Sequence, residues 1–316
     1  MKYSSLPLVT KSYAKINLYL QVLNKRKDSF HNLSTLFARI DLADTLIFRK
    51  CRDGLIKINC DSPNVPKDKT NLCYRAAALL RQELKLENNG LLSTRQSQKV
   101  SLGVQIDLKK CIPVGAGLGG GSSNAASVLL GLNKFWDLNL PKARLLSLGV
   151  KLGSDVPFFI HQVKFALGSQ RGDKIKPLIS LDKLKLWFIL VYPNLKVSTP
   201  LIYQKFDSYL PVGGAFSRLT RARGNVKIFT SQLLKKRKVV DAGCLFNDLE
   251  VITSSLYPVV NQVKNALSNM GLDKVMMSGS GPAVFAICDS SIQAQSLRNK
   301  LSKQYKSWQI FVTYTI

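Results

Sequence analysis

The chain has 316 residues, 46% of them hydrophobic, which is enough for one large or two ordinary globular domains, and no apolar run is long enough to cross a membrane. Six scattered cysteines without a CxxC pair, and only two histidines, disfavour a disulfide framework, a histidine metal site and Ser-His-Asp hydrolysis, so acid–base chemistry falls to carboxylates or lysines. The formal net charge of +27 attracts polyanions, but it is spread along the whole chain, and no nucleic-acid-binding signature accompanies it.

The first part of the chain shows alternation of apolar and polar residues. This pattern predicts strands over Ser12–Leu23 and Thr35–Phe48, joined by a basic turn. A helix rich in alanine and leucine is expected over Asn71–Leu84, and a polar hairpin or loop over Leu91–Lys99. A further helix is expected over Lys142–Lys151.

From Leu186 onward the predicted order is strand-helix-strand-strand-helix-strand, which is the ferredoxin-like pattern. The six elements are Leu186–Tyr192, Pro258–Met270 (closed by Gly271), Lys274–Met277, Ala283–Cys288, Ser291–Lys303 and Trp308–Ile316. The basic segment Pro211–Lys238 shows no clear period, and we expect it to be the least ordered part of the chain.

A glycine-rich segment, Pro113–Ala126, is the most informative feature of the sequence. A strand is expected over Val100–Ile106, with Leu102, Val104 and Ile106 on one face, and an apolar helix follows the glycines. A glycine loop that leads into a helix N-terminus is an anion site, because free N–H groups and the helix dipole both favour negative charge. The expected ligand is a polyphosphate.

Two other interpretations of the glycine segment are weaker. No Lys-Ser or Lys-Thr pair follows the glycines, so the segment is not a Walker A loop. A flexible linker would show the same composition, but linkers are not usually flanked by a strong strand and a strong helix.

Three separated motifs stand in a fixed order: AKINLYL (Ala14–Leu20), PVGAGLGGGSS (Pro113–Ser123) and SGSGPAVF (Ser278–Phe285). Together they resemble the GHMP kinase superfamily. Further pieces extend the resemblance over most of the chain: KRKDSFHNLSTLF (Lys25–Phe37), TNLCYRAA (Thr70–Ala77), LGSDVPFF (Leu152–Phe159) and FNDLE (Phe246–Glu250). Within the superfamily the motifs are most similar to a kinase of the non-mevalonate isoprenoid pathway, whose acceptor alcohol carries a cytidine diphosphate.

The resemblance implies an α+β fold of two domains with the active site in the cleft between them. The expected domains are residues 1–165, a ribosomal-protein-S5-like nucleotide-binding domain, and residues 166–316, a ferredoxin-like domain. The implied activity is transfer of the γ-phosphoryl group of ATP to the 2-hydroxyl of the cytidine-bearing alcohol, with Mg²⁺ as the expected metal and no metal-ligating residue set assigned.

The resemblance also implies the catalytic pair. Asp155 matches the family's catalytic aspartate, and a carboxylate there can accept the proton of the alcohol. Without the motif it would be interpreted as a helix N-cap or a surface acid. Lys15 matches the catalytic lysine, which would keep that carboxylate ionised and polarise the acceptor hydroxyl or a phosphate oxygen.

For ATP, the resemblance implies that the loop backbone holds the phosphates and that three side chains surround the adenine, with Ser122 a candidate to help hold Mg²⁺. The implied ATP-binding residues are Pro113, Val114, Gly115, Ala116, Gly117, Leu118, Gly119, Gly120, Gly121, Ser122 and Ser123 in the loop, and Asn71, Lys110 and Asn124 around the adenine.

For the second substrate, His31 matches the residue that recognises cytosine, and Phe30 and Tyr203 match aromatics that would sandwich the base. Asn17 lies two residues after Lys15 and would share its strand face. The implied substrate-binding residues are Asn17, Phe30, His31, Tyr203, Ser278, Gly279, Ser280 and Gly281.

One departure from the family pattern lies beside His31. The family usually has glycine where this chain has Ser29, and a positive φ there would strain a serine.

Two alternative functions stay open: another GHMP kinase, acting on homoserine, mevalonate or a sugar, and a basic nucleic-acid-binding protein. Because the first residues lack the continuous apolar segment of a signal peptide, we expect a cytoplasmic monomer or dimer with no membrane partner.

Overall fold

The computed structural model describes residues 6–88, 102–209, 226–236, 239 and 242–316. The chain forms two compact units, each made of several segments. Unit 1 comprises Met1–Tyr13, Ala43–Val114 and Gly120–Gln162, and unit 2 comprises Ala14–Leu42, Gly115–Gly119 and Val163–Ile316. This grouping differs from a single boundary between residues 165 and 166, because the long strands β1 (Leu8–Lys25) and β2 (His31–Lys50) each run through both units.

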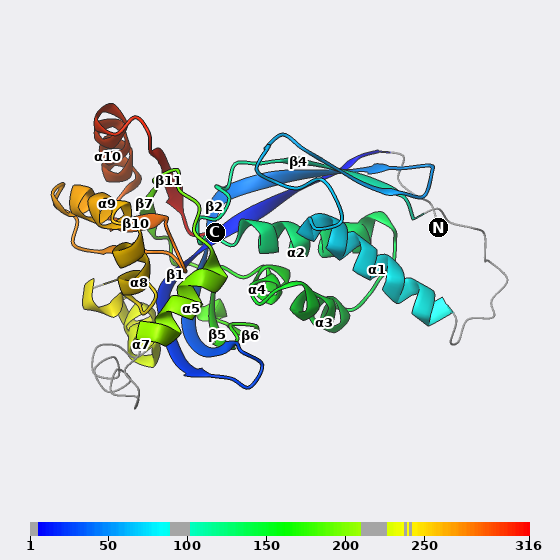
Figure 1. The fold of residues 1–316 in the computed structure, drawn as a ribbon, viewed down its shortest axis with the longest axis horizontal. Coiled ribbons are helices and arrows are strands. Elements are labelled where there is room, and N and C mark those ends of the chain that lie inside the picture. The colour runs from blue at the N-terminus through cyan, green and yellow to red at the C-terminus, as the bar shows by residue number, and fades with distance from the viewer. Residues whose placement is uncertain (1–5, 89–101, 210–225, 237–238, 240–241) are drawn as a thin grey trace. The chain divides into compact units, whose positions relative to one another are not determined.

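Unit 1 is a set of packed helices with a small sheet. Helix α1 packs against α2 and α3, and α4 packs against α2 and α3 (Figure 1). Strand β4 pairs antiparallel with the last six residues of β2 and parallel with β3. The bounds are β3 Ile56–Cys60, α1 Leu72–Asn88, β4 Val104–Lys109, α2 Gly120–Phe135, α3 Lys142–Leu152 and α4 Val156–His161.

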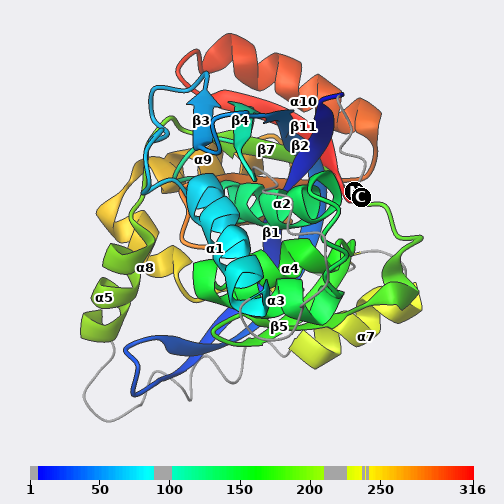
Figure 2. The same ribbon diagram turned by 90° about the vertical axis from the view of Figure 1, so that its right-hand side faces the viewer.

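Unit 2 contains a four-stranded antiparallel sheet in the order β11-β7-β10-β9. Helices α9 and α10 pack against it (Figure 2). The bounds are β7 Trp187–Tyr192, α9 Val259–Ser268, β9 Val275–Met277, β10 Val284–Cys288, α10 Ser291–Gln304 and β11 Gln309–Tyr314. These six elements have the chain order and the pairing of a ferredoxin-like domain, as the sequence predicted.

The remaining elements of unit 2 extend this domain. Strand β5 pairs antiparallel with the first part of β2 and with β6, and β1 pairs with β8 through Tyr19 and Phe246. The bounds are β5 Phe165–Gln170, β6 Lys174–Pro177, η1 Ile179–Leu181, α5 Thr199–Tyr209, α7 Val226–Lys236, η2 Ala242–Cys244, β8 Phe246–Asn247 and α8 Glu250–Leu256.

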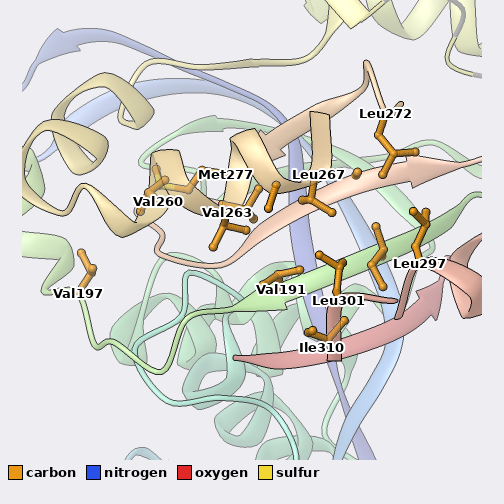
Figure 3. Packing of buried hydrophobic residues seen from close by; sticks show 14 of the residues in the cluster. Val191, Val197, Val260, Val263, Leu267, Leu272, Met277, Leu297, Leu301 and Ile310 are labelled. Atoms are coloured by element: carbon orange, nitrogen blue, oxygen red, sulfur yellow. The ribbon is translucent and has the colours of Figure 1, made fainter. Parts of the chain in front are cut away.

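The core of the ferredoxin-like domain lies between its sheet and its two helices. Figure 3 shows Leu301 of α10 beside Val191 of β7 and Ile310 of β11, and Leu267 on the neighbouring α9. Each such side chain stabilises the fold by roughly 1.5–3 kcal/mol when it is fully buried. Helix α10 starts where the sequence suggests, because the Ser290 hydroxyl accepts a hydrogen bond from the Gln293 N–H.

The structure corrects three details of the sequence prediction. Strand β4 begins at Val104, so Leu102 precedes it, although Val104 and Ile106 are buried on one face as expected. Helix α9 ends at Ser268, two residues before the expected Met270, but Gly271 closes it as expected: it is left-handed (φ +84°), its N–H donates to the Ser268 carbonyl at 2.9 Å, and the Leu272 N–H donates to the Leu267 carbonyl at 3.4 Å.

The third correction concerns the basic segment. Within Pro211–Lys238, residues Val226–Lys236 form helix α7, because Phe229 and Leu233 lie one turn apart and are both buried. Residues 210–225 and 237–238, and the loop expected over 91–99, lie outside the described residues. The α+β fold class itself is confirmed.

Candidate active site

The first half of the glycine loop, Gly115–Gly119, lies in unit 2 and requires glycine. Gly115, Gly117 and Gly119 have φ values of +71°, +77° and +69°. A Cβ on Gly117 would lie 2.2 Å from the carbonyl oxygen of Ser278, so no side chain fits there.

Backbone hydrogen bonds hold this half of the loop. The Lys15 N–H donates to the Leu118 carbonyl at 3.0 Å, and the Ala283 N–H donates to the Ala116 carbonyl at 3.2 Å. The sequence-predicted loop is therefore tied to β1 and to the hairpin that carries Ser278–Gly281.

The second half of the loop opens helix α2 in unit 1. Gly120, Gly121, Ser122 and Ser123 form its first turn, which contains no acidic residue. The N–H groups of a first helical turn have no partner within the helix and favour an anion. The Ser123 hydroxyl is buried and lies 2.7 Å from the Ser12 hydroxyl, whereas Ser122 is half-buried. Of the two hydroxyls, that of Ser122 is the better placed to meet a ligand.

In unit 1, the buried carboxylate of Asp44 holds the residues that precede the glycine loop. Its Oδ1 accepts the N–H groups of Cys111 and Ile112 at 2.8 Å each. Its Oδ2 forms an ion pair with Lys110 and accepts a hydrogen bond from the Asn124 amide at 2.9 Å. Lys110 and Asn124, both predicted ATP residues, are thus brought together by a residue that sequence reasoning missed. The only signal was an aspartate within an apolar strand pattern.

Asn71, the third predicted adenine residue, has a structural role at the start of α1. Its Oδ1 accepts the Cys73 N–H at 2.7 Å, and its Nδ2 donates to the Pro66 carbonyl at 2.5 Å. The side chain is therefore a helix cap. No contact with Lys110 or Asn124 is among those found for the described residues.

In unit 2, Lys15 and Asn17 lie on one face of β1, as the strand period requires. The Lys15 ammonium donates to Asn17 Oδ1 at 2.6 Å and lies over the ring of Phe37, 5.3 Å from its centroid. Asn17 also donates through Nδ2 to Thr35 Oγ1 at 2.8 Å. Lys15 is only 5% exposed, so its ammonium is held in one position before any ligand arrives.

The turn Ser278–Gly281 joins these two features. The Ser278 hydroxyl accepts the Asn17 N–H and donates to the Gly117 carbonyl, each at 3.3 Å. Gly279 and Gly281 adopt positive φ values of +59° and +77°. The Ser280 hydroxyl lies 2.7 Å from that of Thr199.

The FNDLE motif holds this turn from behind. Asn247 donates to the carbonyls of Met277 and Gly279, and Glu250 accepts the Met277 N–H at 2.7 Å. Thr253, one turn further along α8, donates to the Ser280 carbonyl at 3.2 Å. The sequence pointed to this motif, but it did not indicate what the motif contacts.

Asp155 occupies the N-cap position of α4 in unit 1. Its backbone is helical (φ −80°, ψ −16°), and its carboxylate makes no capping hydrogen bond to that described helix. The side chain is half-buried. The alternative interpretation of Asp155, a capping residue, is therefore not supported.

His31 belongs to a buried cluster in unit 2. Its Nε2 lies 2.6 Å from Asp207 Oδ1, and its ring stacks on Tyr203 with the centroids 5.2 Å apart. Its side chain is 4% exposed. Lys25 also pairs with Asp207 at 2.7 Å. Burial alone would raise the pKa of Asp207, but the hydrogen bonds from Lys25 and His31 outweigh it and lower that pKa.

The two rings expected to sandwich the base, Phe30 and Tyr203, each have a charged or aromatic side chain over one face. One face of Tyr203 is covered by His31, so a base could stack only on its other face. Phe30 is 51% exposed, and the guanidinium of Arg171 lies over its ring. Ser29 has φ +67°, a conformation that strains a serine and that glycine adopts without strain. Asp207 and Arg171 were both missed by sequence reasoning.

No group of three or more His, Cys, Asp or Glu side chains that could hold a metal ion occurs among the described residues. No helix in the described part of the chain is long and apolar enough to span a membrane.

Comparison with known proteins defines the class. Residues 71–162 match the model of the GHMP kinases N terminal domain, and residues 235–307 match the model of the GHMP kinases C terminal domain. The fold, the glycine loop and both family matches define a GHMP kinase, an ATP-dependent small-molecule kinase.

The relatives narrow the class further. A 4-diphosphocytidyl-2-C-methyl-D-erythritol kinase from Trichodesmium erythraeum is 37% identical, over 90% of this chain and 88% of its own length. The enzyme of the same name from Syntrophus aciditrophicus is 36% identical, over 96% of this chain and 98% of its own length. The chain belongs to the family of 4-diphosphocytidyl-2-C-methyl-D-erythritol kinases.

Solved structures agree. A crystal structure of 4-(cytidine 5'-diphospho)-2C-methyl-D-erythritol kinase matches with a TM-score of 0.71 and 31% identity, covering 98% of this chain and all of that one. A homoserine kinase from Cytophaga hutchinsonii matches with a TM-score of 0.65 at 21% identity, which shows the shared fold alone.

Proposed function

We propose that this kinase transfers the γ-phosphoryl group of ATP to the 2-hydroxyl of 4-diphosphocytidyl-2-C-methyl-D-erythritol, in the non-mevalonate route to isoprenoid precursors. The observation that carries the proposal is the identity of 36–37% with kinases named for this substrate, over nearly the full length of both chains. Of the alternatives, homoserine and mevalonate kinases are supported by likeness of fold alone.

The chemical roles follow from phosphoryl transfer, which depends on positioning and on neutralising charge. Asp155 is the proposed base for the acceptor hydroxyl, and its half-buried carboxylate makes no capping bond to α4. Lys15 is proposed to polarise the acceptor oxygen or a phosphate oxygen. Its bond to Asn17 and its burial support this role, because the ammonium is already oriented.

The nucleotide is proposed to lie on the glycine loop. The first turn of α2 offers N–H groups to the phosphates, and Lys110 and Asn124 are proposed to border the adenine. Mg²⁺ would be held mainly by the phosphates, with the Ser122 hydroxyl as the protein group that fits it best.

The cytidine diphosphate is proposed to be bound by unit 2. Phe30 would stack on the base, and the cluster of His31 and Tyr203 would line the same subsite. Asn17 and the turn Ser278–Gly281 would contact the rest of the substrate. A kinase whose acceptor carries no cytidine has no use for the segment around His31.

Three further points belong to the same proposal. We also propose two domains, residues 1–165 with the glycine-rich ATP loop and residues 166–316 with the ferredoxin-like elements. A cytoplasmic location is supported by the six cysteines, none of which is in a disulfide. Action as a monomer or dimer on a small molecule, without nucleic acid, fits the kinase fold.

A coupled assay of ADP release tests the proposed function. The acceptors are 4-diphosphocytidyl-2-C-methyl-D-erythritol, homoserine, mevalonate and a sugar, each with ATP and Mg²⁺. We expect kcat/KM to be at least about 10³-fold higher for the cytidine-bearing alcohol, because a site built to hydrogen-bond its substrate rejects analogues that leave its polar groups unpaired. Equal or greater turnover of another acceptor would overturn the proposal.

A further inference from the structure

The β5–β6 turn in unit 2 carries an arginine that lies against the exposed ring of Phe30. The Arg171 guanidinium carbon is 5.2 Å from the ring centroid, which is within the range of a cation–π contact. Strand pairing explains the contact, because β5 and β2 align Gln170 opposite Leu33. The residue after Gln170 is thereby brought to the start of β2.

Arg171 is itself held in one orientation. Its Nε and Nη2 donate to the same oxygen of Asp173, Oδ2, at 2.9 and 2.7 Å. The Asp173 side chain is only 8% exposed, and its Oδ1 is buried with no hydrogen-bond partner among the described residues. A buried carboxylate of this kind needs its cation, so Asp173 keeps Arg171 in place.

The backbone at Phe30 is also fixed. The Phe30 carbonyl accepts a hydrogen bond from the Arg26 N–H at 2.7 Å, and the Phe30 N–H donates to Asp28 Oδ1 at 3.3 Å. Together with the positive φ of Ser29, these bonds set the direction in which the ring leaves the turn. The ring is therefore held at its backbone and on one face, while half of its surface stays exposed.

We propose that Arg171, oriented by Asp173, is a positioning residue that backs Phe30 and makes its other face a preformed platform for the pyrimidine base of the substrate. This inference rests on the proposed function, since it requires a nucleoside in unit 2. A ring that already occupies one rotamer loses less entropy when a base stacks on it. Stacking on an aromatic face tolerates any base, so the platform supplies affinity and leaves recognition of the base edge to other groups.

Binding of cytidine 5'-diphosphate and uridine 5'-diphosphate to the full-length protein, measured by calorimetry, tests this role. Arg171→Met alone would leave Asp173 buried and unpaired, so the informative variant is the double change Arg171→Met/Asp173→Asn. We expect it to bind both nucleotides about 2- to 5-fold more weakly, the size of an exposed cation–π contact. Phe30→Ala should weaken both by about 5- to 150-fold through lost stacking.

The triple variant separates positioning from direct contact. Because Arg171 acts through Phe30, adding Arg171→Met/Asp173→Asn to Phe30→Ala should cause no further loss. In the kinase assay the double variant should raise the KM for the cytidine substrate without raising the KM for ATP. Arg49→Met/Asp107→Asn removes another arginine–aspartate pair, in unit 1, and should leave nucleotide binding unchanged.

The outcomes distinguish this inference from the proposed function. If Phe30→Ala weakens binding and the double variant does not, or if the two losses add in full, Arg171 has no positioning role and the proposed function stands. Loss of cytidine diphosphate binding in the double variant without loss of uridine diphosphate binding would also overturn the platform. If the wild-type protein binds neither nucleotide, both the inference and the proposed function are wrong.

Discussion

Asn247 and Gly279 are joined by a hydrogen bond of 2.8 Å from the side-chain amide to the carbonyl oxygen, and the same amide nitrogen donates to Met277 at 2.9 Å. One side chain thus holds the residue that precedes the turn Ser278–Gly281 and a residue inside it. That turn reaches the glycine loop and Asn17 through the hydroxyl of Ser278. The FNDLE motif is therefore proposed to affect the site indirectly, by holding the turn Ser278–Gly281 in place.

Replacement of Asn247 by alanine should lower both stability and activity. Two buried carbonyls would lose their donor, a loss of about 1–3 kcal/mol in the free energy of unfolding. Asn247→Asp should be worse, because a carboxylate would face two carbonyl oxygens. Urea unfolding and kcat/KM measure the two effects, and Asn299→Ala on the exposed side of α10 is the control. Unchanged kcat/KM in Asn247→Ala would show that the turn does not depend on this bond.

Asp155→Asn should leave a folded protein that still binds ATP but has lost most phosphoryl transfer. The change is nearly isosteric and removes only the base, whose contribution is about 10²- to 10⁴-fold in kcat. Calorimetry should therefore show unchanged ATP binding, while the coupled assay shows the loss of turnover. Asp137→Asn, on an exposed turn of the same unit, should keep wild-type turnover. Wild-type turnover in Asp155→Asn would remove this residue from the mechanism.

Gly117 and Gly271 form a matched pair for testing the loop. Both have positive φ values, +77° and +84°, but a Cβ at Gly117 meets a carbonyl oxygen at 2.2 Å, whereas nothing lies within 4 Å of a Cβ at Gly271. Gly271→Ala should cost only the conformational strain, about 1 kcal/mol. Gly117→Ala should also displace the loop and raise the KM for ATP at least about tenfold. Equal effects of the two variants on KM would contradict the proposed phosphate-binding role of this loop.

Gly120→Val tests the helical end of the loop. A Cβ at Gly120 would lie 3.0 Å from Ile112 and 3.4 Å from the Lys110 ammonium. A branched side chain there would crowd both residues and the space proposed for the phosphates. ATP affinity, measured by calorimetry, should fall sharply in a protein that keeps its fold. Unchanged affinity would place the phosphates elsewhere.

His31→Ala should weaken use of the cytidine substrate much more than it weakens ATP binding. The substitution removes the ring that stacks on Tyr203 and leaves Asp207 with Lys25 as its remaining partner. We expect kcat/KM for the cytidine substrate to fall at least about tenfold while the KM for ATP stays within about twofold. His161→Ala replaces the other histidine and serves as the control. A parallel fall of both parameters would mean that the His31 cluster is only structural.

Asp248 predicts a specific pH dependence of stability. Burial raises its pKa to about 6, although its Oδ2 accepts the Val22 N–H at 2.7 Å. The folded state binds the carboxyl proton of Asp248 more tightly than the unfolded chain does, so protonation of Asp248 stabilises the folded state. This contribution to the free energy of unfolding is fully present below about pH 4 and is lost as the pH rises through about 6. Tyr19 beside it, whose pKa is raised to about 12 by burial and by Asp248, stays neutral throughout.

Asp248→Asn should therefore be more stable than the wild type at about pH 7.5, by up to roughly 3 kcal/mol, and the difference should vanish at about pH 4. Urea unfolding at both pH values measures it, with Asp289→Asn on an exposed turn as the control. The same pH dependence in Asp248→Asn and the wild type would mean that another group is responsible.

Local patterns in the sequence determined most of the elements and the kind of ligand. Alternation predicted β1 and β2, and the helix over Lys142–Lys151 formed within one residue of its expected end. The ferredoxin-like order of unit 2 was also predictable, because period, caps and turn residues act over a few neighbours. The glycine that the family usually has in place of Ser29 also suggested a positive φ at this position, and the structure has one.

Only the tertiary structure decided which side chains act together. Asp44 with Lys110, Asp207 with His31, Asn247 with Gly279 and Arg171 with Phe30 are separated by 32 to 176 residues in the chain. Such contacts depend on strand register and helix packing, and a shift of one residue in a strand would turn each side chain to the opposite face. A local pattern does not carry that information, because burial in a common core selects the register only when the whole unit folds.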